Sequence, residues 1–109
     1  MSRPLRIIRP DCLYHITSRG NRKQDIVRDD GDRAAFVRIL ADVVIEKRWI
    51  LHAWVLMTNH IHLVVTTPLS NLSAGMRELL RGYSARFNTV HGLTGNLFHH
   101  RFRSKLVER

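Results

Sequence analysis

The segment Leu56-Met57-Thr58-Asn59-His60-Ile61-His62-Leu63-Val64-Val65 determines more of the fold than any other stretch of the chain. It predicts two strands joined through Thr58-Asn59, a two-residue hairpin connection. Side chains alternate between the faces of a strand, so His60 and His62 should lie side by side, about 6–7 Å apart at the backbone. The apolar residues between and after them should point to the opposite face, where helices can pack.

The register of this hairpin follows from its short turn. If Met57 faces His60, then Val55 faces His62. His52 falls on the apolar face in that register, and we do not expect it to join the histidine pair.

The remaining elements surround this hairpin. We predict a strand over 13–18, a helix capped by Asp29, Asp30 or Asp32, a helix from Ser70 or Asn71 to about His91, and a last strand over 97–107. The predicted apolar stripes of the helices are Phe36, Val37, Leu40, Val43 and Val44, and then Leu72, Met76, Leu79, Tyr83, Phe87 and Val90. The order β-α-β-β-α-β is typical of a ferredoxin-like α+β fold, an antiparallel sheet covered by two helices. We expect one domain spanning 1–109.

The net charge of the chain indicates the class of its binding partner. The chain has 18 Lys and Arg against 9 Asp and Glu, a net charge of +9. Such an excess in a short chain favours a polyanionic partner, nucleic acid before a membrane surface. No apolar run is long enough to span a membrane, and the N-terminus lacks the apolar core of a signal peptide. The single cysteine, Cys12, excludes an intrachain disulfide and a Cys-based zinc site, so the cytoplasm is the expected compartment.

Two groups of side chains could carry chemistry. His60 and His62 are placed to share a divalent cation, although they could also be exposed polar residues that alternate with buried neighbours. Tyr83 lies in an apolar helical stripe, with Arg77 and Arg81 on a neighbouring face. Its phenol could attack a phosphodiester while arginines hold flanking phosphates, or its ring could simply belong to the core. The basic turn from Arg19 to Lys23 could contact phosphates or bases, or be an ordinary solvated turn.

Beyond these patterns, the sequence resembles a known family. Asn59 to Val64 resembles the histidine–hydrophobic–histidine motif of the HUH nucleases, and Tyr83 with Phe87-Asn88 resembles the tyrosine helix of their single-tyrosine transposases. Further matching segments are Arg3 to Ile7, Tyr14 to Arg22, Leu56-Met57, Gly75-Met76 and Gly95 to Phe102. The ordered set is similar to the REP-associated tyrosine transposases, relatives of the small insertion-sequence transposases, and spans nearly the whole chain.

The resemblance implies a metal-dependent reaction on single-stranded DNA next to a hairpin. A tyrosine attacks the scissile phosphate, a 5′-phosphotyrosine forms, and a released 3′-hydroxyl later rejoins strands. In this chain Tyr83 would be the nucleophile, and His60 and His62 would bind Mg²⁺ or Mn²⁺. The implied DNA-binding residues are Arg19, Asn21, Arg22, Lys23, Arg77, Arg81 and Arg86. Imidazole alone would favour softer ions, so the choice of metal rests on the family.

The chain departs from the family pattern in two places. The family often has Gln or Asn one helical turn after the tyrosine as third ligand, whereas this chain has Phe87 there, which leaves Asn88 as the substitute. The family also continues past Lys105 to Glu108 into a further helical segment, which this chain lacks. A strand-cleaving transposase and a non-catalytic DNA-hairpin-binding module therefore both remain open. The resemblance also leaves open whether the protein is a monomer or a homodimer.

Overall fold

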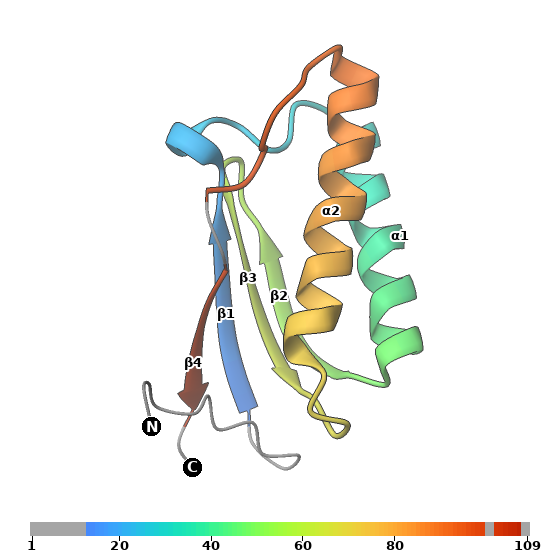
Figure 1. Ribbon diagram of the computed structural model, residues 1–109, viewed down its shortest axis with the longest axis vertical. Helices are drawn as coiled ribbons and strands as arrows, with labels where there is room; N and C mark the ends of the chain where they lie inside the picture. The colour runs from blue at the N-terminus through green and yellow to red at the C-terminus, as the bar shows by residue number, and fades with distance from the viewer. Residues whose placement is uncertain (1–12, 100–101, 108–109) are drawn as a thin grey trace.

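The computed structural model describes residues 13–99 and 102–107 and has two layers, a four-stranded antiparallel sheet and two helices on one of its faces (Figure 1). The elements are β1 (Leu13–Arg19), a short 3-10 turn (Asn21–Lys23), α1 (Asp30–Lys47), β2 (Ile50–Leu56), β3 (His60–Thr66), α2 (Leu72–His91) and β4 (Arg103–Val107). The strand order is β2-β3-β1-β4, so β1 and β3 are central. The predicted α+β class and its β-α-β-β-α-β order are confirmed.

The β2–β3 hairpin has the register that the sequence predicts. The Met57 amide donates to the His60 carbonyl at 2.8 Å, and Val55 lies opposite His62. The prediction that His52 lies on the apolar face is wrong, because the pairing shifts between Leu51 and Ala53 and leaves His52 in a bulge. The His52 ring lies 2.9 Å from the Thr66 hydroxyl, and Thr66 alternates onto the face of His60 and His62.

Alternation along the central strands separates a buried face from an open one. In β3, Ile61, Leu63 and Val65 are fully buried beneath the helices, whereas His60 and His62 are only half-buried on the other side. The helices add buried apolar stripes to this core, and α2 contributes Leu72, Gly75, Met76, Leu79, Tyr83 and Phe87. The open face is therefore the part of the sheet that can meet a partner.

Three predicted details differ from the structure. Val37 and Val90 are 43% and 53% exposed, because each lies at the margin of its helical stripe rather than over the sheet. The last strand begins at Arg103 and not at residue 97. Leu97 and Phe98 instead pack into the core, where Phe98 makes an isolated bridge with Gly20. Residues 100 and 101 lie outside the described part of the chain.

A close contact between Gly75 of α2 and Trp49, the residue before β2, gives a first prediction. A Cβ atom at Gly75 would lie 2.1 Å from Cζ2 of Trp49, whose indole is held by a 2.9 Å hydrogen bond to Asn71. We expect Gly75→Ala to lower the free energy of unfolding by about 1–3 kcal/mol. Gly82→Ala is the control, since its Cβ would meet only Ile39 at 3.5 Å and the helix should gain stability. Chemical denaturation of both variants measures the difference, and equal stabilities would contradict the prediction.

No helix in the described ranges is both long enough and apolar enough to cross a membrane.

Candidate functional site

Three histidines meet on the open face of the sheet. The rings of His60 and His62 lie edge to face with their centroids 4.8 Å apart. β1 adds His15, whose ring stacks on that of His62 at 5.2 Å. The predicted placement of His60 and His62 on one face is therefore observed, and His15 is a neighbour that sequence reasoning missed. Alternation along β1 determines which face of the strand carries His15. This is informative about the histidine site only once β1 is known to pair with β3.

Among residues 13–99 and 102–107, the contacts of the His60 and His62 rings involve Nδ1 and leave Nε2 available on both. Nδ1 of His60 lies 2.8 Å from the Asn59 side-chain oxygen. Nδ1 of His62 lies 3.0 Å from Nε2 of His15 and 3.3 Å from the Thr17 hydroxyl. Ligating histidines in proteins are typically oriented in this way, through the ring nitrogen that does not bind the metal. The Nε2 atoms of His60 and His62 are therefore the atoms that could ligate a metal here.

Burial and neighbouring charge favour the neutral form of His62. Burial, followed by the charges of His60 and His15, lowers the pKa of His62 below its usual value. A neutral imidazole is the form that ligates a metal. The donor set therefore fits a divalent cation, and its all-nitrogen chemistry suits Mn²⁺ better than Mg²⁺.

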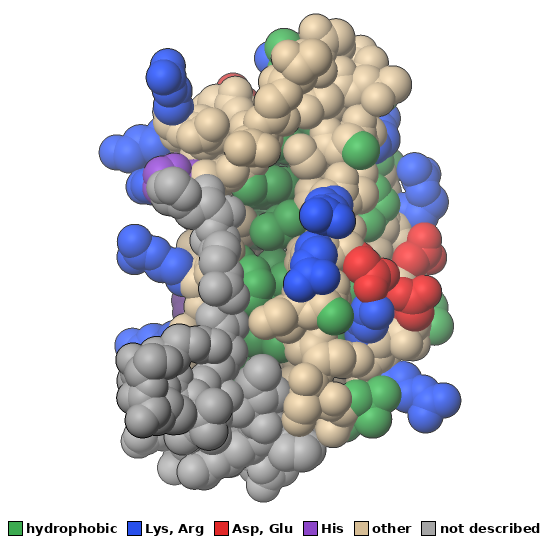
Figure 2. Space-filling model, in the orientation of Figure 1, with side chains coloured by type: hydrophobic (Ala, Val, Ile, Leu, Met, Phe, Trp, Pro, Cys, Tyr) green, Lys and Arg blue, Asp and Glu red, His purple; other side chains and the backbone are tan. Residues whose placement is uncertain are grey.

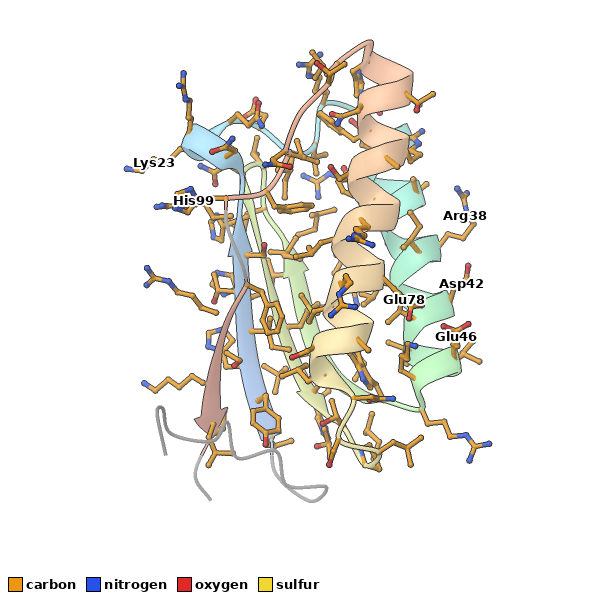
Figure 3. All side chains as sticks on the ribbon, viewed as in Figure 1. Lys23, Arg38, Asp42, Glu46, Glu78 and His99 are labelled. Carbon is orange, nitrogen blue, oxygen red and sulfur yellow. The ribbon has the colours of Figure 1, made fainter. Side chains whose placement is uncertain are left out.

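The strands around the histidines carry positive charge. Arg19 pairs with His60 across β1 and β3, and Thr17 stands between His62 and Arg103. The four described strands contain no Asp or Glu. Apart from Asp25, in the loop after the 3-10 turn, the described carboxylates lie on or at the start of the helices, and Asp42, Glu46 and Glu78 are on the side of the molecule away from Lys23 and His99 (Figures 2 and 3). This segregation makes the sheet side the better surface for a polyanion.

Tyr83 lies on the other side of the sheet from the histidines. Its side chain is fully buried among aromatic rings, with Phe36 edge-on at 5.5 Å, and its hydroxyl donates to the Ile26 carbonyl. Burial, and then the charge of Asp32, raises the pKa of Tyr83. The structure therefore does not bring the expected nucleophile to the expected metal ligands. Tyr14, the second of the two tyrosines in the chain, is buried in the same helix-covered core.

The other predicted residues of α2 are divided between two surroundings. Arg77 and Arg81 are exposed, and Arg81 borders a groove of about 480 Å³ between α2 and the segment 96–98. Asn88 also lines this groove and donates to the Gly95 carbonyl at 3.0 Å, which anchors the loop after α2 rather than placing an amide beside His60. This position does not support Asn88 as the third metal ligand.

The basic turn after β1 projects from the end of the sheet. Arg22 and Lys23 are exposed and adopt left-handed backbone angles, with φ of 55° and 59°. Asn21 is tied to the segment before Phe98 through its amide, 3.4 Å from the Asn96 carbonyl. Arg19 is exposed beside the histidines, so this turn continues the cationic surface of the open face.

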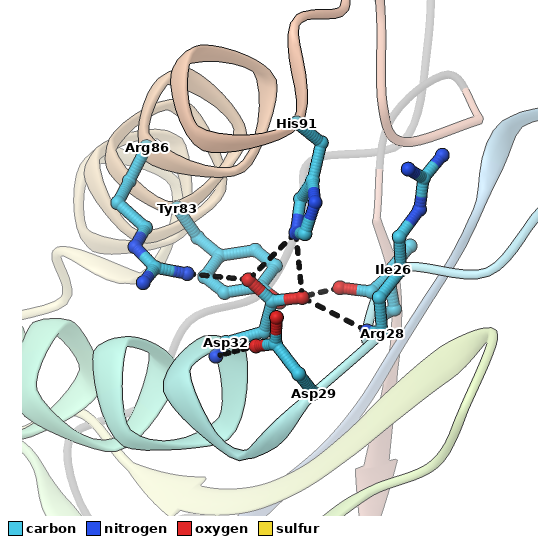
Figure 4. A network of polar contacts seen from close by, with 7 residues as sticks. All are labelled: Ile26, Arg28, Asp29, Asp32, Tyr83, Arg86 and His91. Carbon is cyan, nitrogen blue, oxygen red and sulfur yellow. Dashed lines mark hydrogen bonds and ion pairs between the residues drawn. The ribbon is translucent and has the colours of Figure 1, made fainter.

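A second polar cluster is built around a buried carboxylate (Figure 4). Asp32 is completely buried, accepts from the Arg28 amide at 2.8 Å, and pairs with Arg86 and with His91 at 2.9 Å. Arg86, expected to contact DNA, is therefore committed to an internal ion pair. Asp29, Asp32 and His91 could in principle hold a metal, since their ligand atoms lie within 4.8 Å of one another. The guanidinium already on Asp32 makes this site a poor fit, because a second cation would have to displace it.

Comparisons with known proteins agree with this geometry. Residues 9–108 match the family model described as transposase, IS200-like. A solved REP-associated tyrosine transposase bound to a REP hairpin is similar in structure, with a TM-score of 0.77, 20% identity, and coverage of 100% of this chain and 64% of that one. A candidate transposase from Deinococcus radiodurans R1 has a TM-score of 0.71 and 17% identity over 99% of this chain and 87% of its own. No curated protein sequence matches this chain.

Proposed function

The chain belongs to the IS200-like transposase family, and we propose that its domain binds single-stranded, hairpin-containing DNA on the open face of the sheet and holds a divalent cation there for strand cleavage and rejoining. The observation that carries the proposal is the pair His60 and His62, with both Nδ1 atoms engaged and both Nε2 atoms available. The hairpin bound by the REP-associated relative, of which this chain spans 64%, supports the choice of DNA.

Each part of the open face has a role in this proposal. His60 and His62 would hold the cation, which would polarise a phosphodiester and stabilise charge on its non-bridging oxygens. Thr17 and His15 orient the His62 ring. Arg19, Arg22 and Lys23 would bind flanking phosphates as charged donors. Mg²⁺ or Mn²⁺ is the cation that the family implies, and we expect Mn²⁺ to bind more tightly.

Binding can be tested with a DNA hairpin that carries a single-stranded extension. We expect its affinity to fall about tenfold or more between about 50 and 200 mM salt, because each neutralised phosphate releases counterions. The same strand made fully double-stranded should bind more weakly. Fluorescence anisotropy measures both. Affinity that does not change with salt would contradict the proposed surface.

A non-catalytic hairpin-binding module is the second candidate, and the burial of both tyrosines favours it. A nucleophilic role for Tyr83 would require its ring to leave the core, which opens a cavity costing about 3–5 kcal/mol. Labelled hairpin DNA incubated with the protein and Mn²⁺ distinguishes the candidates. Cleavage supports the transposase reaction, whereas retained binding without any product supports the module.

Tyr83→Phe tests the assignment of this residue directly. We expect the variant to lose about 1–3 kcal/mol of stability, because the buried Ile26 carbonyl loses its donor. DNA affinity should stay within about twofold of wild type at temperatures where the variant is folded, whereas any cleavage and rejoining should stop, because Phe lacks the oxygen that would form the 5′-phosphotyrosine link. Denaturation and cleavage assays on the same samples provide the measurement. A denaturation-resistant DNA adduct on Tyr83 would establish it as the nucleophile, and cleavage that persists in Tyr83→Phe would exclude that role.

A further inference from the structure

Two described parts of the C-terminal segment contact β1 on either side of Ser18. Thr17 lies opposite Arg103, and the Arg19 carbonyl accepts from the His99 amide at 2.8 Å. A pocket of about 190 Å³ is lined by residues from both contacts. Its volume equals that of about six water molecules, which is enough for a phosphate group.

The lining of the pocket matches an anion. Thr17, Ser18, Arg19, His99 and Arg103 line it, and none of them carries negative charge. Arg19 and Arg103 are exposed, so their guanidinium groups are accessible to a ligand. Ser18 alternates onto the helix-covered face and its hydroxyl is shielded from solvent, so Thr17 supplies the hydroxyl on the open side of the pocket. Hydroxyl and guanidinium donors around a small pocket suit an anion with several acceptor oxygens.

This pocket adjoins the histidine site. Thr17 belongs to both, since it lines the pocket and its hydroxyl lies 3.3 Å from Nδ1 of His62. Arg19 pairs with His60 in the sheet register. An anion in the pocket and a phosphodiester at the histidines would therefore be neighbours on the same face.

We propose that this pocket binds a backbone phosphate of the DNA strand next to the phosphodiester at the histidine pair, and that Arg103 is a positioning residue for that strand. The inference rests on the proposed function, because it assumes that DNA crosses the open face. Arg103 would fix the register of the strand, since a planar guanidinium can hold two oxygens of one phosphate. A strand held at this phosphate would present the neighbouring phosphodiester to His60 and His62.

The test combines protein variants with hairpin DNAs in which one phosphate at a time is replaced by a neutral methylphosphonate. We expect Arg103→Gln to weaken binding of the unmodified hairpin about tenfold, and Arg103→Lys to give a smaller loss. At one methylphosphonate position, wild type and Arg103→Gln should bind equally, because the partner of the arginine is gone. Arg38→Gln, at an exposed residue of α1, should show no such position, and any position coupled to Lys105→Gln, on the same strand and face, should differ from that of Arg103.

The outcomes separate this inference from the proposed function. If wild type fails to bind any hairpin, the proposed function fails and the inference fails with it. If wild type binds but no methylphosphonate position is coupled to Arg103, the inference alone is overturned. Calorimetry with inorganic phosphate tests the source of the anion. Arg103-dependent binding of phosphate without coupling to DNA would also overturn the inference, whereas coupling accompanied by intact Mn²⁺ binding in Arg103→Gln supports it.

Discussion

His60→Ala and His62→Ala should each lower the affinity for Mn²⁺ by about 100-fold or more, because each removes one of the two ligand nitrogens. Substitutions that only disturb the orientation of a ligand already cost about 10–100-fold in metal affinity. His15→Ala should fall in that lower range, since its contact is to Nδ1 of His62 and not to the cation itself. Calorimetry or electron paramagnetic resonance with Mn²⁺ measures these affinities.

His52→Ala is the matched control for these variants. His52 is exposed in the bulge of β2 and contacts Thr66 instead of the histidine pair. Its removal should change Mn²⁺ affinity less than about twofold, which is the scale expected for a residue outside the ligand environment. Equal losses of Mn²⁺ affinity in His52→Ala and His62→Ala would indicate that affinity depends on the number of histidines and not on a defined pair. This result would rule out the proposed site.

Features set by local sequence were predictable in this protein. The two-residue turn at Thr58-Asn59 fixes the hairpin register, and alternation then fixes the shared face of His60 and His62. The helical period placed Tyr83 in the apolar stripe of α2, where it lies. The core reading of this tyrosine was therefore available from the pattern itself, and only the resemblance to the transposases favoured a catalytic role.

Features that depend on tertiary pairing were not predictable in the same way. His15 becomes a neighbour of His62 only when β1 is inserted between β3 and β4. Asp29, Asp30 and Asp32 are the predicted cap candidates, and Asp29 is the N-cap of α1, whose side chain accepts from the Asp32 amide at 2.8 Å. The side-chain partners of the Asp32 carboxylate, Arg86 and His91, lie 54 and 59 residues away in the sequence, and no local pattern indicates them. The ion pair of Arg86 with Asp32 could not be read from the sequence for the same reason.

The Asp32 cluster joins the start of α1 to the last turns of α2, and its disruption should have the largest effect on stability. Asp32→Asn keeps the shape of the side chain but removes its charge, which leaves Arg86 and His91 beside each other without their shared counterion. Breaking a buried ion pair costs about 3–5 kcal/mol, and we expect the lower end because Arg86 is 29% exposed. Thermal or chemical denaturation at neutral pH measures this loss.

The pH dependence of the same variant checks the cause. Burial alone would raise the pKa of Asp32, but the Arg28 amide, His91 and Arg86 together hold it below its usual value. A carboxyl group with a lowered pKa stabilises the fold at neutral pH, and this contribution is lost as the pH falls from about 4 through the pKa of the folded state. The stability difference between wild type and Asp32→Asn should therefore shrink on acidification. Arg33→Gln, on an exposed neighbour in α1, is the control and should show no such convergence. A difference that stays constant down to pH values near 2 would mean that packing of the side chain, and not its charge, accounts for the loss.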